Sequence, residues 1–186
     1  MKSPEGIKEE LLVLMADIFP TGYFAASNAF TGYTPEQIAD QKVVVIGCGP
    51  VGLCALINAL EYKPKHLLAV DSIPSRLELA RSLGAEPWNF QLDRAGLDKR
   101  VLELTDGRGA DAVIEVVGLS PALRTGFDLL RPWGTISSVG VHNGEVASTP
   151  NPSASYPDRS LMHGRFRGME MRLMGRTCES RWGAVL

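Results

Sequence analysis

The fold of this chain is decided by the stretch Val43-Val44-Val45-Ile46-Gly47-Cys48-Gly49-Pro50-Val51-Gly52. Four β-favouring apolar residues run directly into three glycines at the G-x-G-x-x-G spacing, and apolar residues continue toward Leu60. This pattern predicts a buried strand, a tight turn and the start of a helix. Gly47 would allow the tight turn, Gly49 would let a pyrophosphate approach the backbone, and Gly52 would let the helix pack close to the strand.

The sequence around the turn supports a dinucleotide site. Pro50 and Val51 lie in the turn, and the N-terminus of the helix that follows would offer N–H groups and a positive dipole end to an anion. An acid, Asp71, ends the next apolar run at the distance typical of such sites, about 20 residues. Its carboxylate can accept hydrogen bonds from the adenosine ribose and would repel a 2′-phosphate, which favours NAD(H) over NADP(H). The alternative is that Asp71 is only a turn residue.

Expected strands and helices alternate from Val43 onward. The expected strands are short apolar or β-branched runs, at residues 43–46, 67–70, 87–90, 111–118 and 134–140, with a sixth, edge strand at 168–175. This rhythm predicts an α/β fold, a Rossmann-type doubly wound parallel sheet of six strands with helices on both faces. Glu115 would be a buried acid near the cofactor or, more simply, a hydrogen-bonded carboxylate at the end of a strand.

Other signals place boundaries along the chain. Residues 1–40 are expected to be a helical lead-in packed on the core, and residues 41–186 the dinucleotide-binding domain. Within the lead-in, Pro20-Thr21-Gly22 is expected to interrupt two helices. Farther on, Ser75 and Glu78 have the spacing of a capping box, and Gly84 would end that helix.

Composition narrows the functional classes. The chain has 186 residues, 45% of them hydrophobic, and a formal net charge of -2, so its charge gives no case for nucleic-acid binding. Its three cysteines form no C-x-x-C pair or disulfide framework, which is typical of reduced thiols in a cytoplasmic protein. No signal peptide is recognisable, and no apolar run reaches the roughly 18 residues of a membrane span.

Several further segments share a pattern with one known family. They are residues 17–23, 70–77, 80–85, 105–111, 114–115 and 138–141, in addition to the glycine turn. As an ordered set they resemble the medium-chain, zinc-type alcohol dehydrogenase family, from about Leu12 to the C-terminus. The resemblance implies the cofactor-binding domain of that family, with a small-molecule substrate and a homodimer formed by pairing of the edge strand at residues 169–175.

The resemblance also implies roles for individual residues. The family uses the position of Arg76 to contact the ribose, and positions at the ends of two strands to flank adenosine and nicotinamide: here Val116, Val117, Gly118, Val139, Gly140 and Val141. Thr21 matches a residue that packs near the nicotinamide. The simpler alternatives are a solvated arginine, core valines and a threonine that caps a helix.

The family's catalytic zinc is not expected here. Relatives carry a GroES-like lobe with a Cys and a Gly-His-Glu motif, whereas this chain has no His-Glu dipeptide and no cysteine before Cys48. Asp17 occupies the place of the third zinc ligand. One carboxylate cannot replace the three protein ligands of a catalytic zinc site. Asp17 is therefore expected to be vestigial or structural, and the alternatives are a general acid or base and a metal ligand.

Three functions remain open from the sequence. The first is an NAD(H)-linked oxidoreductase for an alcohol, an aldehyde or a related carbonyl. The second is a non-redox catalyst, such as a cyclase, isomerase or lyase, with Asp17 and Thr21 in a cleft that the missing lobe would expose. The third is a non-enzymatic NAD-binding or partner-binding module. The sequence does not support a short-chain dehydrogenase mechanism, because no Tyr-x-x-x-Lys pair occurs.

Overall fold

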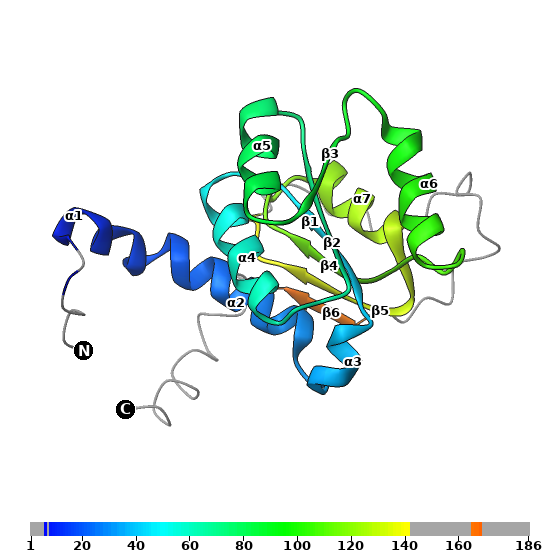
Figure 1. Cartoon of the computed structure of the whole chain (residues 1–186), viewed down its shortest axis with the longest axis horizontal. Helices are drawn as coiled ribbons and strands as arrows, with labels where there is room; N and C mark the ends of the chain where they lie inside the picture. Colours follow the sequence, from blue (N-terminus) through cyan, green and yellow to red (C-terminus); the bar gives the residue numbers. More distant parts are fainter. Residues whose placement is uncertain (1–5, 7, 142–164, 169–186) are drawn as a thin grey trace.

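The computed structural model describes residue 6, residues 8–141 and residues 165–168. Helices and strands alternate along most of this part of the chain, as Figure 1 shows. The elements are α1 (Glu9–Leu12), the 3-10 helix η1 (Val13–Ala16), α2 (Ile18–Phe30), α3 (Pro35–Ala39), β1 (Lys42–Ile46), α4 (Pro50–Glu61), β2 (His66–Asp71), α5 (Pro74–Ser82), β3 (Glu86–Asn89), α6 (Arg94–Leu104), β4 (Ala110–Glu115), α7 (Ser120–Leu129), β5 (Leu130–Ser138) and β6 (Arg165–Gly168).

The six strands form one sheet in the order β3-β2-β1-β4-β5-β6, and each neighbouring pair is parallel. This is the strand order of the doubly wound dinucleotide-binding fold. The chain direction across the sheet reverses between β1 and β4, because β2 and β3 lie on one side of β1 while β4, β5 and β6 lie on the other. The predicted fold class is therefore confirmed.

Alternate residues of the strands point to opposite faces and build two apolar layers. Val43 and Val45 pack in the layer that contains the buried alanines of α2 and α4, whereas Val44 and Ile46 pack in the layer that contains α6 and α7. Strands that are buried on both faces explain the near-continuous apolar run 43–46. Helices therefore cover both faces of the sheet, as predicted.

The expected break at Pro20-Thr21-Gly22 is wrong, because α2 runs through these residues from Ile18 to Phe30. Pro20 lies in the first turn of α2, where its missing N–H would have no partner within the helix. The helix continues because the N–H of Thr21 donates to the carbonyl of Asp17 at 2.9 Å. Gly22 then lies so close to α4 that a Cβ there would be 2.6 Å from the Cβ of Cys54.

Two local predictions around the sheet are also corrected. The capping box of Ser75 and Glu78 does not form, since α5 begins at Pro74 with Ile73 as its N-cap and no side chain caps it. Gly84 follows that helix at φ +106, as predicted. The expected strand 111–118 ends at Glu115, because the chain turns there. The sixth strand starts at Arg165, before the predicted start at Gly168, and residues 169–175, with the predicted dimer strand, lie outside the described residues.

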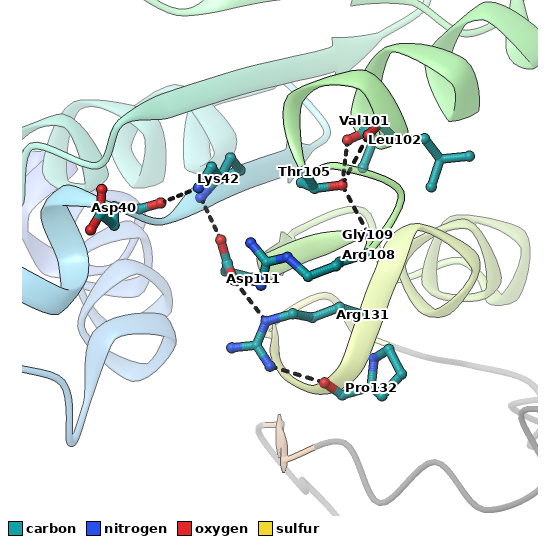
Figure 2. A network of polar contacts seen from close by, with 10 residues as sticks. All are labelled: Asp40, Lys42, Val101, Leu102, Thr105, Arg108, Gly109, Asp111, Arg131 and Pro132. Carbon is teal, nitrogen blue, oxygen red and sulfur yellow. Dashed lines mark hydrogen bonds and ion pairs between the residues drawn. The ribbon is translucent and has the colours of Figure 1, made fainter.

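A polar network holds the amino-terminal edge of the sheet (Figure 2). The buried carboxylate of Asp111 accepts hydrogen bonds from the Lys42 N–H at 2.9 Å and from Arg131 Nε at 2.7 Å. The register of β4 and β5 shifts between Ala110 and Ala112, and β5 bulges there. Asp111 thus ties the starts of β1 and β5 together where the regular strand pairing is interrupted.

Across the described ranges 8–141 and 165–168, every helix falls short of the length or the apolar character that crossing a membrane would require.

Candidate functional site

The glycine turn follows β1 and is closed by backbone packing. Gly47 has φ +98, a conformation that favours glycine, and its N–H donates to the carbonyl of Val70 at 2.8 Å. A Cβ at Gly52 would overlap the carbonyl oxygen of Gly47, so no larger residue fits there without movement. Gly49 is the N-cap of α4 and has open space where its Cβ would be. Gly47 and Gly52 thus have the backbone conformation and the close packing that the sequence predicted, and the space beside Gly49 is open. The approach of a pyrophosphate at Gly49 stays a prediction.

The first turn of α4 faces this open space. Helix geometry gives the N–H groups of Val51 and Gly52 no acceptor within the helix, and Pro50 has no N–H to satisfy. The N–H of Leu53 is the next along the chain, and it donates to the carbonyl of Gly49 at 2.8 Å. Two main-chain donors and the positive end of the helix dipole are thus available to an anion at this position.

Asp71 binds the turn directly through its side chain. It ends β2 and is only 7% exposed. Its Oδ2 accepts the N–H of Cys48 at 2.7 Å, and its Oδ1 accepts those of Ser72 and Ile73 at 2.7 and 2.9 Å. Arg76 Nη1 lies 3.7 Å from Oδ2. The acid therefore connects the glycine turn to the loop that leads into α5.

A cavity of about 460 Å³ opens beside the turn at the carboxyl ends of β1, β2 and β4. Its position is the point where the strand order reverses, which is where open α/β sheets bind ligands. Most of the wall is glycine and apolar side chains, with Asp71, Ser72, Arg76 and Thr125 as the polar members. The lining residues are Ile46, Gly47, Gly49, Pro50, Val51, Gly52, Val70, Asp71, Ser72, Arg76, Phe90, Val116, Val117, Leu119, Pro121, Ala122 and Thr125.

The wall that faces the glycine turn comes from the loop after β4. The side chains of Val116 and Val117 lie against Gly47, where a Cβ would be 2.7 Å from Val117 Cγ2 and 3.2 Å from Val116 Cγ2. Glu115, which is 0% exposed, accepts the N–H groups of Val117 and Gly118 on Oε1, each at 2.8 Å. Its Oε2 accepts the hydroxyl of Ser138 at 2.6 Å. Glu115 is thus the hydrogen-bonded strand-end carboxylate that the sequence suggested.

The predicted site residues divide into three groups. The cavity brings together eight of them: Gly47, Gly49, Pro50, Val51, Gly52, Asp71, Arg76 and Val117. Gly118, Gly140 and Val141 do not line the cavity; they lie where the backbones of the loops after β4 and β5 meet.

Asp17 and Thr21 lie elsewhere, at the start of α2, where the Thr21 hydroxyl donates to Asp17 Oδ1 at 3.1 Å. Asp17 is exposed, Thr21 is half-buried, and neither residue lines the cavity.

Cys48, between Gly47 and Gly49, is fully buried. Burial, and after it the nearby Asp71 carboxylate, raise the pKa of its thiol from 9.0 to about 12. The thiol is therefore neutral at physiological pH and a poor nucleophile. Its backbone N–H, rather than its sulfur, is the group that the site uses.

Comparison with known proteins agrees with this geometry. The family model described as zinc-binding dehydrogenase matches residues 50–178. The chain belongs to the zinc-binding dehydrogenase family. This is the medium-chain alcohol dehydrogenase family that the sequence resembled.

Individual relatives show the extent of the similarity. The chain is 89% identical over 146 residues to zinc-type alcohol dehydrogenase B of Aspergillus flavus, covering 78% of this chain and 34% of that protein. It is 52% identical over 143 residues to the medium chain reductase/dehydrogenase ucsI of Acremonium sp., covering 77% of this chain and 49% of that protein. The alcohol dehydrogenase TADH from Thermus sp. ATN1 superposes with a TM-score of 0.72 at 34% identity, covering 91% of this chain and 45% of that one. The chain thus spans between a third and a half of these relatives' length.

The side chains of this zinc-binding dehydrogenase domain bear on whether it could hold a catalytic zinc. Within residues 8–141 and 165–168, no three His, Cys, Asp or Glu side chains are grouped so that they could hold a metal ion. Asp17 has Thr21 as its hydrogen-bond partner. The described residues therefore do not fit a catalytic zinc, which needs three protein ligands.

Sequence reasoning missed several residues of the dehydrogenase cavity. Phe90, Leu119, Pro121, Ala122 and Thr125 line it from the loop after β3 and from the start of α7. The signal that could have found Pro121 and its neighbours is the expected helix after the fourth strand, whose N-terminus must lie at the same edge as the glycine turn. No local pattern marks Phe90, because its position depends on how far β3 extends.

Proposed function

We propose that this chain binds NAD(H) in the cavity beside the glycine turn. We further propose that it serves as the cofactor-binding part of an oxidoreductase for an alcohol, an aldehyde or a related carbonyl. The observation that supports this most is the meeting of the turn, Asp71 and Arg76 in one cavity at the point where the strand order reverses. The names of the relatives, alcohol dehydrogenases and reductases, support the reaction class.

The residues divide the work of binding. The N–H groups of Val51 and Gly52 and the dipole of α4 would hold the pyrophosphate, and the open space at Gly49 would let it approach. Val116 and Val117 would exclude water from the opposite side. When bound, the nicotinamide supplies the hydride chemistry, and the protein supplies position and electrostatics.

Asp71 would favour NAD(H), although few of its acceptor positions are left for the ribose. A carboxylate has about four lone-pair sites, and three of them already accept the N–H groups of Cys48, Ser72 and Ile73. One position therefore remains for a ribose hydroxyl, while the negative charge still disfavours a 2′-phosphate. A relative at 30% identity is named an NADP-dependent isopropanol dehydrogenase, so the choice of cofactor within the family has to be measured for each member.

The test is a calorimetric or fluorescence titration of the purified chain with NADH and NADPH. We expect saturable binding of NADH and binding of NADPH that is at least about tenfold weaker, a difference of about 1.4 kcal/mol. Gly49→Ala is the matched variant, because a methyl group there meets no protein atom within 4 Å but enters the space of the pyrophosphate. Loss of NADH binding in a folded Gly49→Ala protein would locate the cofactor, and failure of the unaltered chain to bind either nucleotide would refute the proposal.

The non-redox alternative depends on Asp17 and Thr21 at the start of α2. Neither residue lines the cavity, so the site that the structure describes favours the cofactor-binding proposal over this alternative.

A further inference from the structure

The end of β4 carries a buried acid that the binding role described above does not use. Glu115 pairs in register with Ile46 of β1 on one side and with Ser138 of β5 on the other. It therefore occupies the centre of the edge at which the cavity opens. Its side chain is 0% exposed, so a ligand in the cavity cannot touch it directly.

Glu115 holds two loops at once. Through Oε1 it accepts the N–H groups of Val117 and Gly118 in the loop after β4, and through Oε2 it accepts the hydroxyl of Ser138 at the end of β5. Its main-chain carbonyl also accepts the N–H of Val139 at 3.0 Å. Charge-assisted hydrogen bonds of this kind are about twice as strong as neutral ones.

The two loops are pressed together by their glycines. Gly118 has φ +79, and a Cβ there would be 2.6 Å from both the nitrogen and the carbonyl oxygen of Val141. A Cβ at Gly140 would overlap the backbone of Gly118. The close glycine contact and the hydrogen bonds of Glu115 therefore join the two loops into one unit.

This unit forms one wall of the cavity. Val117 lines the cavity, and its side chain packs against the backbone of Gly47. The side chain of Val116 packs against the backbone of both Gly47 and Gly52. A change in the position of residues 116–118 therefore changes the distance between the wall and the glycine turn. The carboxylate of Glu115 influences that distance without contact with the cavity, because it binds the main chain of residues 117 and 118.

We propose that Glu115 is a positioning residue for the bound nucleotide. Its carboxylate fixes the loops after β4 and β5 against each other, keeps Val117 at the mouth of the cavity and thereby slows cofactor dissociation. This inference rests on the proposed function, because it concerns the same cavity and takes NADH as its ligand.

The main test compares Glu115→Ala with Glu115→Gln. Alanine leaves the N–H groups of Val117 and Gly118 without their acceptor, whereas glutamine keeps one carbonyl oxygen for both. We expect Glu115→Ala to raise the Kd for NADH by about tenfold or more, mainly through faster dissociation in stopped flow. Glu115→Gln should stay within about threefold of the unaltered chain, because a neutral acceptor replaces a charged one.

Thr105→Val is the control for a loss of stability without a loss of positioning. Thr105 is also 0% exposed, accepts the N–H of Gly109 at 2.9 Å and lies before the other end of β4 (Figure 2). The Thr105→Val variant should lower Tm to an extent comparable with Glu115→Ala and leave the Kd for NADH unchanged. Equal losses of affinity in both variants would overturn the proposal, and so would normal affinity in Glu115→Ala.

Two further measurements keep the test decisive if Glu115→Ala does not fold. Ser138→Ala removes the hydroxyl that donates to Oε2, leaves the two main-chain bonds to Oε1 in place, and should raise the Kd for NADH by about threefold. Amide hydrogen exchange at Val117 and Gly118 should be faster in this variant without any nucleotide, and unchanged exchange together with unchanged affinity would contradict the inference. If the unaltered chain binds neither NADH nor NADPH, the proposed function fails and this inference fails with it. If the unaltered chain binds NADH but the Glu115 and Ser138 variants bind it equally well, only this inference fails.

Discussion

Buried acids are held differently at the two ends of the parallel strands, which are the amino-terminal and the carboxyl-terminal edges of the sheet. At the amino-terminal edge, Asp111 is 6% exposed and is paired with Arg131 at 2.7 Å, with Arg108 Nη1 at 4.0 Å and with one main-chain N–H (Figure 2). At the carboxyl-terminal edge, Asp71 accepts three main-chain N–H groups and has Arg76 Nη1 at 3.7 Å, and Glu115 accepts two main-chain N–H groups and the Ser138 hydroxyl. An arginine makes the shortest contact with Asp111, whereas main-chain N–H groups make the short contacts with Asp71 and Arg76 lies farther away.

The difference shows which edge is arranged for a ligand. An acid that is neutralised by arginines serves the connection between strands, and its charge has little reach beyond the pair. An acid that is held mainly by main-chain N–H groups fixes the loops around a cavity. Asp71 therefore stabilises the glycine turn, and under the proposed function the same carboxylate would disfavour a 2′-phosphate.

The largest effect is expected from steric overlap at the carboxyl-terminal edge. Gly52→Ala should reduce the free energy of unfolding by about 3 kcal/mol or more, because its Cβ would overlap the backbone of Gly47. Gly107→Ala at the other edge should cost about 1–2 kcal/mol, because φ is +78 but no atom lies within 4 Å. Urea unfolding measures both, and equal costs would show that the turn at Gly52 is able to relax.

The second prediction separates the two acids by function. Asp71→Ala leaves three main-chain N–H groups without their acceptor, and Asp111→Ala leaves Arg131 without its carboxylate. Each should lower the free energy of unfolding by about 3 kcal/mol. Only Asp71→Ala should weaken nucleotide binding, with NADH losing more than NADPH. Isothermal calorimetry on folded variants is the measurement, and weaker NADH binding in Asp111→Ala would remove the contrast between the edges.

The third prediction uses the buried thiol of the glycine turn. The pKa of Cys48 is raised to about 12, so the folded chain keeps a proton that the unfolded chain releases above pH 9.0. The stability that this neutral thiol contributes is complete below pH 9 and is lost as the pH rises toward 12, with a slope of at most about 1.4 kcal/mol per pH unit. Urea unfolding between pH 8 and pH 11 should show a shallower loss for Cys48→Ala than for the unaltered chain. Parallel slopes would contradict the raised pKa.

The smallest effect is expected at Asp17, which belongs to neither edge. Asp17→Ala should change the free energy of unfolding by about 0.5 kcal/mol or less, because Asp17 is exposed. Its NADH affinity should equal that of the unaltered chain. Assays without nucleotide provide the control, since an activity that needs no cofactor and is lost in Asp17→Ala would favour the non-redox alternative.

Local patterns were sufficient to predict the fold, because the strand at 43–46, the glycine turn and Asp71 are each visible within a short window. The same reasoning failed at Pro20, where a helix breaker lies in the one turn that tolerates it. It failed at Ser75 for a related reason, since Pro74 begins α5 and leaves no place for a capping box.

The packing of the candidate site could not be predicted in the same way. The bond from the Cys48 N–H to Asp71 joins residues 23 apart, and the bond from Ser138 to Glu115 also spans 23 residues. Both depend on which strands become neighbours. The contact of Gly118 with Gly140 likewise exists only once β4 and β5 are paired. The sequence indicates these residues as candidates, but their contacts follow from which strands are neighbours in the sheet.

The close contact at Gly22 has a mechanical consequence. Helix α2 lies on α4 with almost no space between the backbones, while α1 and η1 extend away from the sheet (Figure 1). A side chain at residue 22 would hold the two helices apart, whereas glycine lets their backbones pack directly against each other. Helix α4 begins at the glycine turn. A larger residue at position 22 would therefore push α2 away from α4, and because α4 begins at the glycine turn, we expect that displacement to alter the place where the pyrophosphate would bind.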